Sequence, residues 1–137
     1  MSVYVFNQLT RQLQRNWVFR RMAASLAAPV DIDPNGTFKY ILIKATNKSG
    51  AEQLIVRGYA DCHYHGDVFD KVSPALEKQG LKLDCLGGGR ISHDAAQKTI
   101  NVYGYSTGYG RADHSKSVEI LKSHFPDYNI TWTNDGY

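Results

Sequence analysis

Segments with the composition of strands and of helices alternate along this chain in the order ββα-ββα-β. β-Branched and aromatic residues form short runs that predict strands, and apolar residues at helical spacing predict helices. The predicted strands are 38–44, 54–57, 81–86, 98–103 and 128–132, and the predicted helices span about 68–80 and 112–124. A chain of 137 residues has room for one domain of this kind and not for two. The sequence therefore predicts a single α/β domain.

Two residues refine the first predicted helix. Pro74 lies within it and is expected either to kink the helix or to start a new turn. Gly80 is expected to end it as a C-terminal cap.

Three glycines lie in segment 103–110 (YGYSTGYG), between a predicted strand and the second predicted helix. Glycine allows positive φ and close approach of the backbone, and the start of a helix offers free N–H groups. Such a junction holds a phosphate without a metal. Because short glycine-rich motifs are weakly specific, a hairpin or left-handed turn with tyrosines packed on it is an open alternative.

The first predicted helix follows a similar junction. Segment 58–61 (GYAD) leads through positions 65–66 (HG) into that helix, as segment 104–107 (GYST) leads through Gly110 into the second. Two ββα halves related by a pseudo-twofold would bring both junctions to one side of the sheet. Proteins with α/β folds bind ligands at such places.

The net charge of +3 is concentrated at the N-terminus. Residues 1–21 contain four arginines and no acid, and the remaining residues carry 12 basic against 13 acidic side chains. The body of the protein therefore lacks the basic surface that nucleic-acid binding requires. Cys62 and Cys85 show no metal-ligand spacing, and a reducing compartment is the default. No apolar run approaches the ~20 residues of a membrane span.

The N-terminal tract is expected to be an extension over residues 1–28, with the domain spanning 29–137. The extension is interpreted as flexible, as an alternative start preceding Met22, or as targeting sequence. Apolar residues at roughly helical spacing in an acid-free tract are compatible with a mitochondrial transit segment, but the tract is poor in serine. We expect a cytoplasmic monomer, or a mitochondrial protein if residues 1–21 act as a transit segment.

Asp61, His63 and His65 alternate along the first junction, so an extended backbone would point all three side chains in one direction. One interpretation is a metal site of Asp/His/His type. Another assigns His65 alone as a nucleophile or general base, since the start of a helix disfavours the imidazolium and keeps the ring neutral. A surface or capping histidine is the third interpretation.

Several cations are candidates for binding an anion near these junctions. Lys39 shares a strand face with Ile41 and Ile43, an unusual place for an ammonium unless it lies over a cleft at the sheet edge. Arg57 follows a strand and Arg90 follows glycines, and Arg90 is the better candidate because glycines allow close approach. His114, near the start of the second predicted helix, is interpreted as a second imidazole that lines the cleft.

Five blocks of sequence resemble the Janus/Ocnus family. They are segments 30–33 (VDID) with 38–40 (FKY), 65–72 (HGDVFDKV), 86–93 (LGGGRISH), 102–106 (VYGYS), and 125–128 (FPDY) with 132–137 (WTNDGY). The resemblance covers residues 29–137 and leaves the N-terminal extension outside it. It implies an α/β fold with a mixed sheet flanked by two helices, and a metal-independent phosphatase without a cofactor that acts on phosphohistidine in proteins.

The resemblance also implies roles for particular residues. His65 corresponds to the catalytic histidine, and Lys39, Ser106 and Gly108 to residues that bind the phosphoryl group. Gly66 stands where family members commonly have alanine, and its N–H remains available to the phosphate. Together with Arg90 these form the expected site.

Hydrolysis of a phosphoramidate requires little more than positioning, charge stabilisation and a proton for the leaving imidazole. His65 is therefore expected either to attack phosphorus or to deprotonate water. Two other functions stay open: a non-catalytic regulator that binds phosphate, and a metal-dependent hydrolase using Asp61, His63 and His65. Phosphohistidine-containing proteins are the expected partners, without nucleic acid or membrane.

Overall fold

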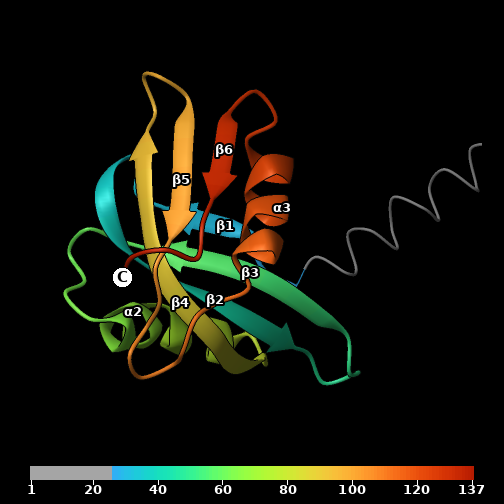
Figure 1. Ribbon diagram of the computed structural model, residues 1–137. Helices are drawn as coiled ribbons and strands as arrows, with labels where there is room; N and C mark the ends of the chain where they lie inside the picture. Colours follow the sequence, from blue (N-terminus) through green and yellow to red (C-terminus); the bar gives the residue numbers. More distant parts are fainter. Residues whose placement is uncertain (1–25) are drawn as a thin grey trace, which may run out of the picture.

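The computed structural model describes residues 26–137 (Figure 1). The interpretations of the tract 1–21 fall outside the described residues. The strands are β1 (Val30–Ile32), β2 (Asn35–Thr46), β3 (Glu52–Gly58), β4 (Lys82–Asp94), β5 (Thr99–Tyr103) and β6 (Asn129–Trp132), and the helices are α2 (His65–Lys78) and α3 (His114–His124).

All six strands form one mixed sheet with the order β1-β3-β2-β4-β5-β6. The central pairs are antiparallel, whereas β1 pairs parallel with β3 at one edge and β6 pairs parallel with β5 at the other. The sheet is strongly twisted, so that β5 and β6 run steeply across β2 and β3 (Figure 1). The predicted fold is confirmed, with one addition: the three-residue strand β1.

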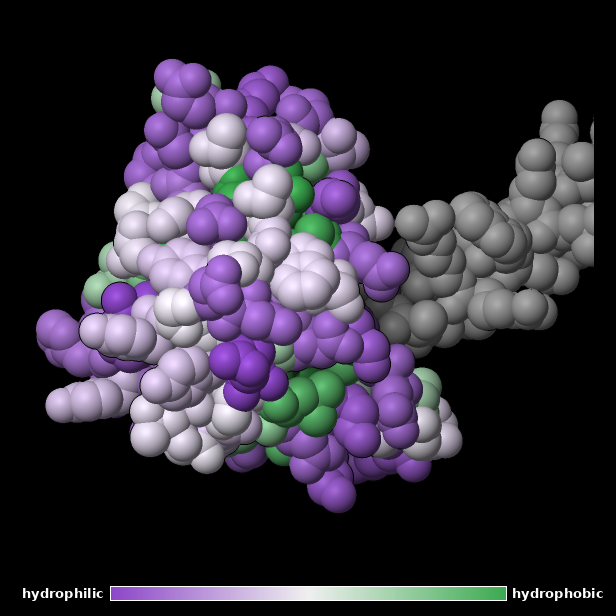
Figure 2. Space-filling model, in the orientation of Figure 1, coloured by the Kyte–Doolittle hydropathy of each residue, from purple (hydrophilic) through white to green (hydrophobic). Residues whose placement is uncertain are grey.

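Each face of the sheet is covered by one helix because β2 alternates apolar residues on both sides. Ile41, Ile43 and Ala45 face one cluster of buried residues, which α2 completes with Val68, Val72 and Leu76. Phe38, Tyr40 and Leu42 face the other cluster, which α3 completes with Val118 and Leu121. Apolar side chains are largely withdrawn into these clusters, and the face in Figure 2 shows only small hydrophobic patches.

Helix α2 runs without a break from His65 to Lys78 with Pro74 inside it, so the expected start of a new turn at Pro74 is wrong, and the kink stays a prediction. Gly80 adopts a positive φ of 86° just beyond Gln79, the last capping residue. Its N–H donates to the carbonyl oxygen of Glu77, and the N–H of Leu81 reaches back to Leu76. Gly80 therefore ends the helix as predicted.

The glycines at 87–89 lie inside β4, so the predicted end of this strand at residue 86, with a glycine turn before Arg90, is wrong. β4 is a long strand that pairs with β2 throughout, with a register shift between Leu42 and Ile43. The chain reverses only after Asp94, where Lys98 adopts a positive φ of 54° before β5. Glycines occur in this strand because neighbouring groups occupy the space that their side chains would fill.

Residues 26–28, which the sequence places in the extension, are hydrogen bonded to β3. Gln53 accepts from the N–H of Ala27 at 3.1 Å and donates to its carbonyl oxygen at 2.9 Å. Arg57 donates to the carbonyl oxygen of Ala28 at 2.8 Å. Neither helix described for residues 26–137 is long and apolar enough to cross a membrane.

Candidate functional site

One cavity of about 420 Å³ lies where the β3–α2 junction meets the loop between β5 and α3. Both strand-to-helix junctions line it, although their helices cover opposite faces of the sheet. All six residues of the expected site line this cavity: Lys39, His65, Gly66, Arg90, Ser106 and Gly108. Their individual roles stay predictions.

His65 is the first residue of α2 and is buried. Its Nε2 lies 2.9 Å from the carbonyl oxygen of Gly89. Because a carbonyl only accepts, Nε2 carries the proton and Nδ1 holds a free lone pair in the neutral ring. Burial lowers the pKa of His65 below its ordinary 6.5, and the positive charges of Lys39 and Arg90 lower it further, against the opposing effect of the Gly89 hydrogen bond. At neutral pH the ring is therefore a neutral base.

Lys39 and Arg90 lie directly opposite each other on β2 and β4. Strand alternation places Lys39 on the face that α2 covers, together with Ile41 and Ile43. β2 is an interior strand, so the expected position of Lys39 at the sheet edge is wrong. The pairing of β2 with β3 nevertheless ends at Tyr40, so Lys39 lies just beyond the paired part of that side of the strand. Two like charges directly opposite each other on neighbouring strands repel and are destabilising. An anion in the cavity that both side chains line would relieve that repulsion.

The loop between β5 and α3 is held against β4 by its backbone. Gly88 donates to the carbonyl oxygen of Gly110 at 2.9 Å and accepts from the N–H of Ala112 at 3.0 Å. Within the loop, Ser106 is buried, exchanges backbone hydrogen bonds with Gly110, and accepts from the N–H of Tyr109 through Oγ at 3.1 Å. The Ser106 hydroxyl therefore keeps its own proton to donate to a ligand.

The sequence predicts that the glycine-rich loop leads directly into α3, whose N-terminus would bind the anion. In the structure it is the N-terminus of α2 that reaches the cavity. α3 begins only at His114, after Asp113. The Asp113 carboxylate accepts from the N–H groups of Ser115 and Lys116, so the start of α3 is already capped. The start of α2 contributes Gly66 to the cavity lining instead.

His114 does not line the cavity, and its interpretation as a second cleft imidazole is wrong. It is buried on the opposite face of the sheet, with Nε2 at 2.7 Å from the carbonyl oxygen of Gly104 and Nδ1 at 2.6 Å from the Tyr40 hydroxyl. Burial is the main cause that lowers its pKa. His114 thus holds Gly104, at the beginning of the glycine-rich loop, from the face of the sheet that α3 covers.

Arg57 is buried on β3 and does not line the cavity either. Its guanidinium donates to the carbonyl oxygens of Val56 and Ala28, and burial lowers its pKa. Arg57 therefore fixes the chain entering β1. Of the two arginines that the sequence offers for the substrate, the structure brings only Arg90 to the cavity.

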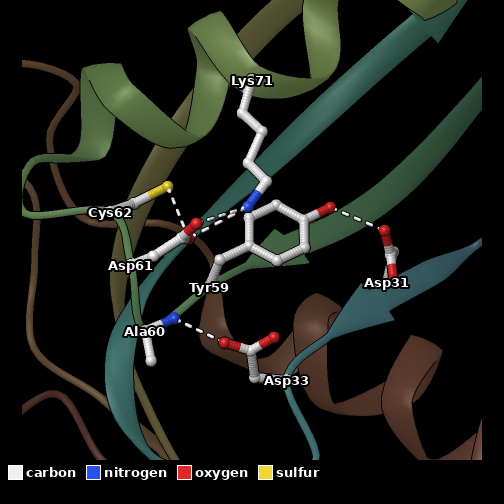
Figure 3. A network of polar contacts seen from close by, with 7 residues as sticks. All are labelled: Asp31, Asp33, Tyr59, Ala60, Asp61, Cys62 and Lys71. Atoms are coloured by element: carbon white, nitrogen blue, oxygen red, sulfur yellow. Dashed lines mark hydrogen bonds and ion pairs between the residues drawn. The ribbon is translucent and has the colours of Figure 1, made fainter.

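Asp61, His63 and His65 do not form the Asp/His/His ligand set of the metal interpretation. The Asp61 carboxylate receives two hydrogen bonds from Lys71, at 2.9 and 3.0 Å (Figure 3). His63 lies outside the cavity that contains His65. Residues 26–137 bring together no group of three His, Cys, Asp or Glu side chains that would hold a metal ion.

Among residues 26–137, four exposed tyrosines line the cavity: Tyr64, Tyr105, Tyr109 and Tyr137. The Arg90 guanidinium lies 5.6 Å from the centre of the Tyr137 ring. Sequence reasoning treated the loop tyrosines as packing residues and overlooked Tyr64 and Tyr137. Tyr64 precedes His65 directly and was a detectable signal, whereas nothing in the sequence indicates that Tyr137 returns to the site.

We expect Gly88→Ala to destabilise the protein by about 1–3 kcal/mol or more and to impair the site. A Cβ at this position would lie 2.6 Å from Cδ2 of His65 and 2.7 Å from the carbonyl oxygen of Tyr40. The imidazole must then move away from Gly89. Thermal unfolding, together with activity measured on the folded fraction, checks this expectation.

Gly66→Ala is the matched stability control, since no atom lies within 4 Å of the added Cβ. Alanine in the first turn of a helix should leave the melting temperature unchanged or slightly higher. Equal melting temperatures for the Gly88→Ala variant and the wild type would contradict the contact between Gly88 and His65.

The model of the Janus/Ocnus family matches residues 25–129. A protein of Sus scrofa named 14 kDa phosphohistidine phosphatase is 52% identical over 123 residues, which cover 84% of this chain and 98% of that protein. The protein of the same name from Homo sapiens is 51% identical over 119 residues, covering 82% and 95%. The sex-regulated protein janus-A of Drosophila melanogaster is 43% identical over 108 residues, covering 79% and 80%. These matches confirm the resemblance carried by the five blocks of sequence: the chain belongs to the Janus/Ocnus family.

Proposed function

We propose that this protein is a metal-independent protein phosphohistidine phosphatase in which Nδ1 of His65 carries out the chemistry. The observation that carries the proposal is a buried neutral imidazole whose Nε2–H is fixed on the Gly89 carbonyl, beside the two opposed cations Lys39 and Arg90. Relatives named phosphohistidine phosphatase that align over most of the chain support the choice of substrate.

The phosphoryl group of the substrate would occupy the cavity. Lys39 and Arg90 neutralise its charge, the Ser106 hydroxyl donates to one of its oxygens, and the N–H groups of Gly66 and Gly108 contribute further hydrogen bonds. Charge and hydrogen bonds fixed in advance cost no reorganisation when the reaction begins. The tyrosines around the cavity suit the flat imidazole of the substrate and the polypeptide that bears it.

The reaction breaks the P–N bond, and the electron pair returns to the leaving imidazole, which takes up a proton. Nδ1 of His65 either removes a proton from the attacking water or accepts the phosphoryl group itself before water releases it. Both routes require the unprotonated nitrogen that the hydrogen bond to Gly89 leaves free. Both end with inorganic phosphate and an unmodified histidine on the substrate.

Phosphate release from matched peptides tests the proposed function. One peptide carries phosphohistidine, and a second of otherwise equal sequence carries phosphoserine. We expect the wild-type protein to hydrolyse the first and leave the second intact, because a serine leaving group needs stronger activation than this site supplies. Binding of the phosphohistidine peptide without turnover would instead support the non-catalytic regulator, and preference for phosphoserine would overturn the proposal.

The activity should persist at mildly acidic pH. The unprotonated form of His65 is the active one and its pKa is lowered by burial and by the positive charges of Lys39 and Arg90, so kcat/KM should decline only below pH 6.5. Lys39→Ala removes one of those charges and should move this decline to higher pH. NMR titration of the His65 ring measures its pKa in the wild type and in Lys39→Ala. The pH profiles of kcat/KM, corrected for spontaneous hydrolysis of the substrate, show where the activity of each protein declines. A ring that titrates above pH 6.5 in the wild type would contradict this expectation.

A further inference from the structure

A second hollow of about 170 Å³ lies beside the cavity and shares Lys39 and Arg90 with it. On its far side it is bounded by Ala60, Cys62 and His63, from the junction that leads to His65. The two opposed cations thus stand between two concave surfaces. Phosphate chemistry accounts for the first and leaves the second unexplained.

The junction that bounds this second hollow is held by polar contacts (Figure 3). Asp33 accepts from the N–H of Ala60 at 2.7 Å, and Asp61 is paired with Lys71 from α2. The Lys71 ammonium also lies 4.4 Å from the centre of the Tyr59 ring. Contacts to the connection between β1 and β2 and to α2 therefore hold the backbone of Ala60 and Asp61 in place beside the hollow.

The charges around the second hollow favour an anion. Lys39 and Arg90 are two positive charges on its lining, and His63 adds an exposed imidazole with a ring N–H to donate. Of the two carboxylates bonded to this junction, Asp61 is paired with the Lys71 ammonium, whereas Asp33 accepts from the neutral Ala60 amide and keeps its charge. No carboxylate among the described residues lines the hollow.

We propose that this second hollow binds an acidic side chain of the substrate polypeptide, close in sequence to the phosphohistidine. The inference rests on the proposed function, because the phosphohistidine in the main cavity brings its neighbouring residues over the adjacent surface. A carboxylate there would meet Lys39 and Arg90 from the side opposite the phosphoryl group, with His63 on its outer side. His63 is then a specificity-determining residue for acidic sequences around the phosphohistidine.

Steady-state hydrolysis of a peptide series tests the inference. The reference peptide carries alanines around one phosphohistidine, and each other peptide replaces one alanine, within two positions on either side, by glutamate or by lysine. His63→Glu places a negative charge at the edge of the second hollow, and His63→Lys places a permanent positive charge there. His124→Glu is the matched control, because it makes the same change at an exposed histidine at the end of α3 that lines neither hollow.

We expect a glutamate peptide to show a KM about threefold to tenfold lower than the reference, with little change in kcat, as fits an interaction present before the reaction. His63→Glu should abolish this preference, His63→Lys should strengthen it, and His124→Glu should preserve it. His124→Glu should hydrolyse the reference peptide with the wild-type kcat and KM. For each His63 variant the measured quantity is the ratio of kcat/KM between the glutamate peptide and the reference peptide, in which any effect common to all peptides cancels.

Equal KM values for glutamate, alanine and lysine peptides at every position would overturn the subsite and leave the proposed phosphatase function standing. A preference that survives His63→Glu would also overturn it. Failure of the wild type to hydrolyse any phosphohistidine peptide would overturn the proposed function and, with it, this inference.

Discussion

Replacement of His65 by alanine is expected to lower kcat by about 10²–10⁴-fold, the usual contribution of a positioned acid–base group. Among the residues that the structure describes, His65 has the only imidazole that lines the cavity, and the variant loses it together with the free Nδ1 that the proposed reaction requires. It also leaves the buried carbonyl oxygen of Gly89 without its side-chain partner, which costs about 1–3 kcal/mol of stability. Rates of phosphate release and thermal unfolding curves measure the two effects separately.

His124→Ala is the control for this experiment, since it removes an exposed histidine at the end of α3. It should retain wild-type activity. A folded His65→Ala variant with near-normal kcat would show that no imidazole of the cavity carries out the chemistry, because the other lining residues among positions 26–137 include no histidine.

Lys39→Ala is expected to lower kcat/KM by about one to three powers of ten, equivalent to roughly 1.4–4 kcal/mol for a charge-assisted contact in a preorganised site. Lys39→Arg should restore part of the activity, because it keeps the charge and changes the geometry. Inorganic phosphate should inhibit the wild type competitively and bind more weakly to Lys39→Ala. Steady-state kinetics gives kcat/KM for each variant, and the same measurement with phosphate as inhibitor gives the inhibition constant of phosphate.

Wild-type kcat/KM and phosphate affinity in Lys39→Ala would assign the phosphoryl charge to Arg90 instead. Arg57 is no longer a candidate, since its guanidinium is buried and bonded to backbone carbonyl oxygens. Arg90→Ala is therefore the informative companion variant.

The parts of the fold that follow from local patterns could be predicted from the sequence. Apolar alternation along β2 and the helical spacing in α2 are both repeated several times, so each element is indicated by several residues. β1 has only three residues, and its existence depends on parallel pairing with β3. The glycines of β4 could not be placed in a strand from the sequence, because tertiary contacts explain why glycine is needed there. The His65 ring packs on Gly88, and the His114 ring lies where a Cβ of Gly89 would be.

The candidate site was predictable to the extent that its residues stand at junctions. His65 and Ser106 each lie beside a strand-to-helix connection, and both connections line the cavity. Lys39 and Arg90 are 51 positions apart, and only the register between β2 and β4 places them opposite each other. His114 lies close to the glycine-rich loop in sequence, yet it faces the other side of the sheet, since position along the chain does not specify a face at a loop.

Phosphate release from a phosphohistidine peptide by metal-stripped wild-type protein most directly tests whether His65 carries out this reaction without a metal. We predict that treatment with a chelator leaves kcat/KM unchanged, that added zinc or manganese does not raise it, and that His65→Ala is inactive under the same conditions. Loss of activity on chelation with recovery on adding the metal, or equal rates for His65→Ala and the wild type, would contradict it.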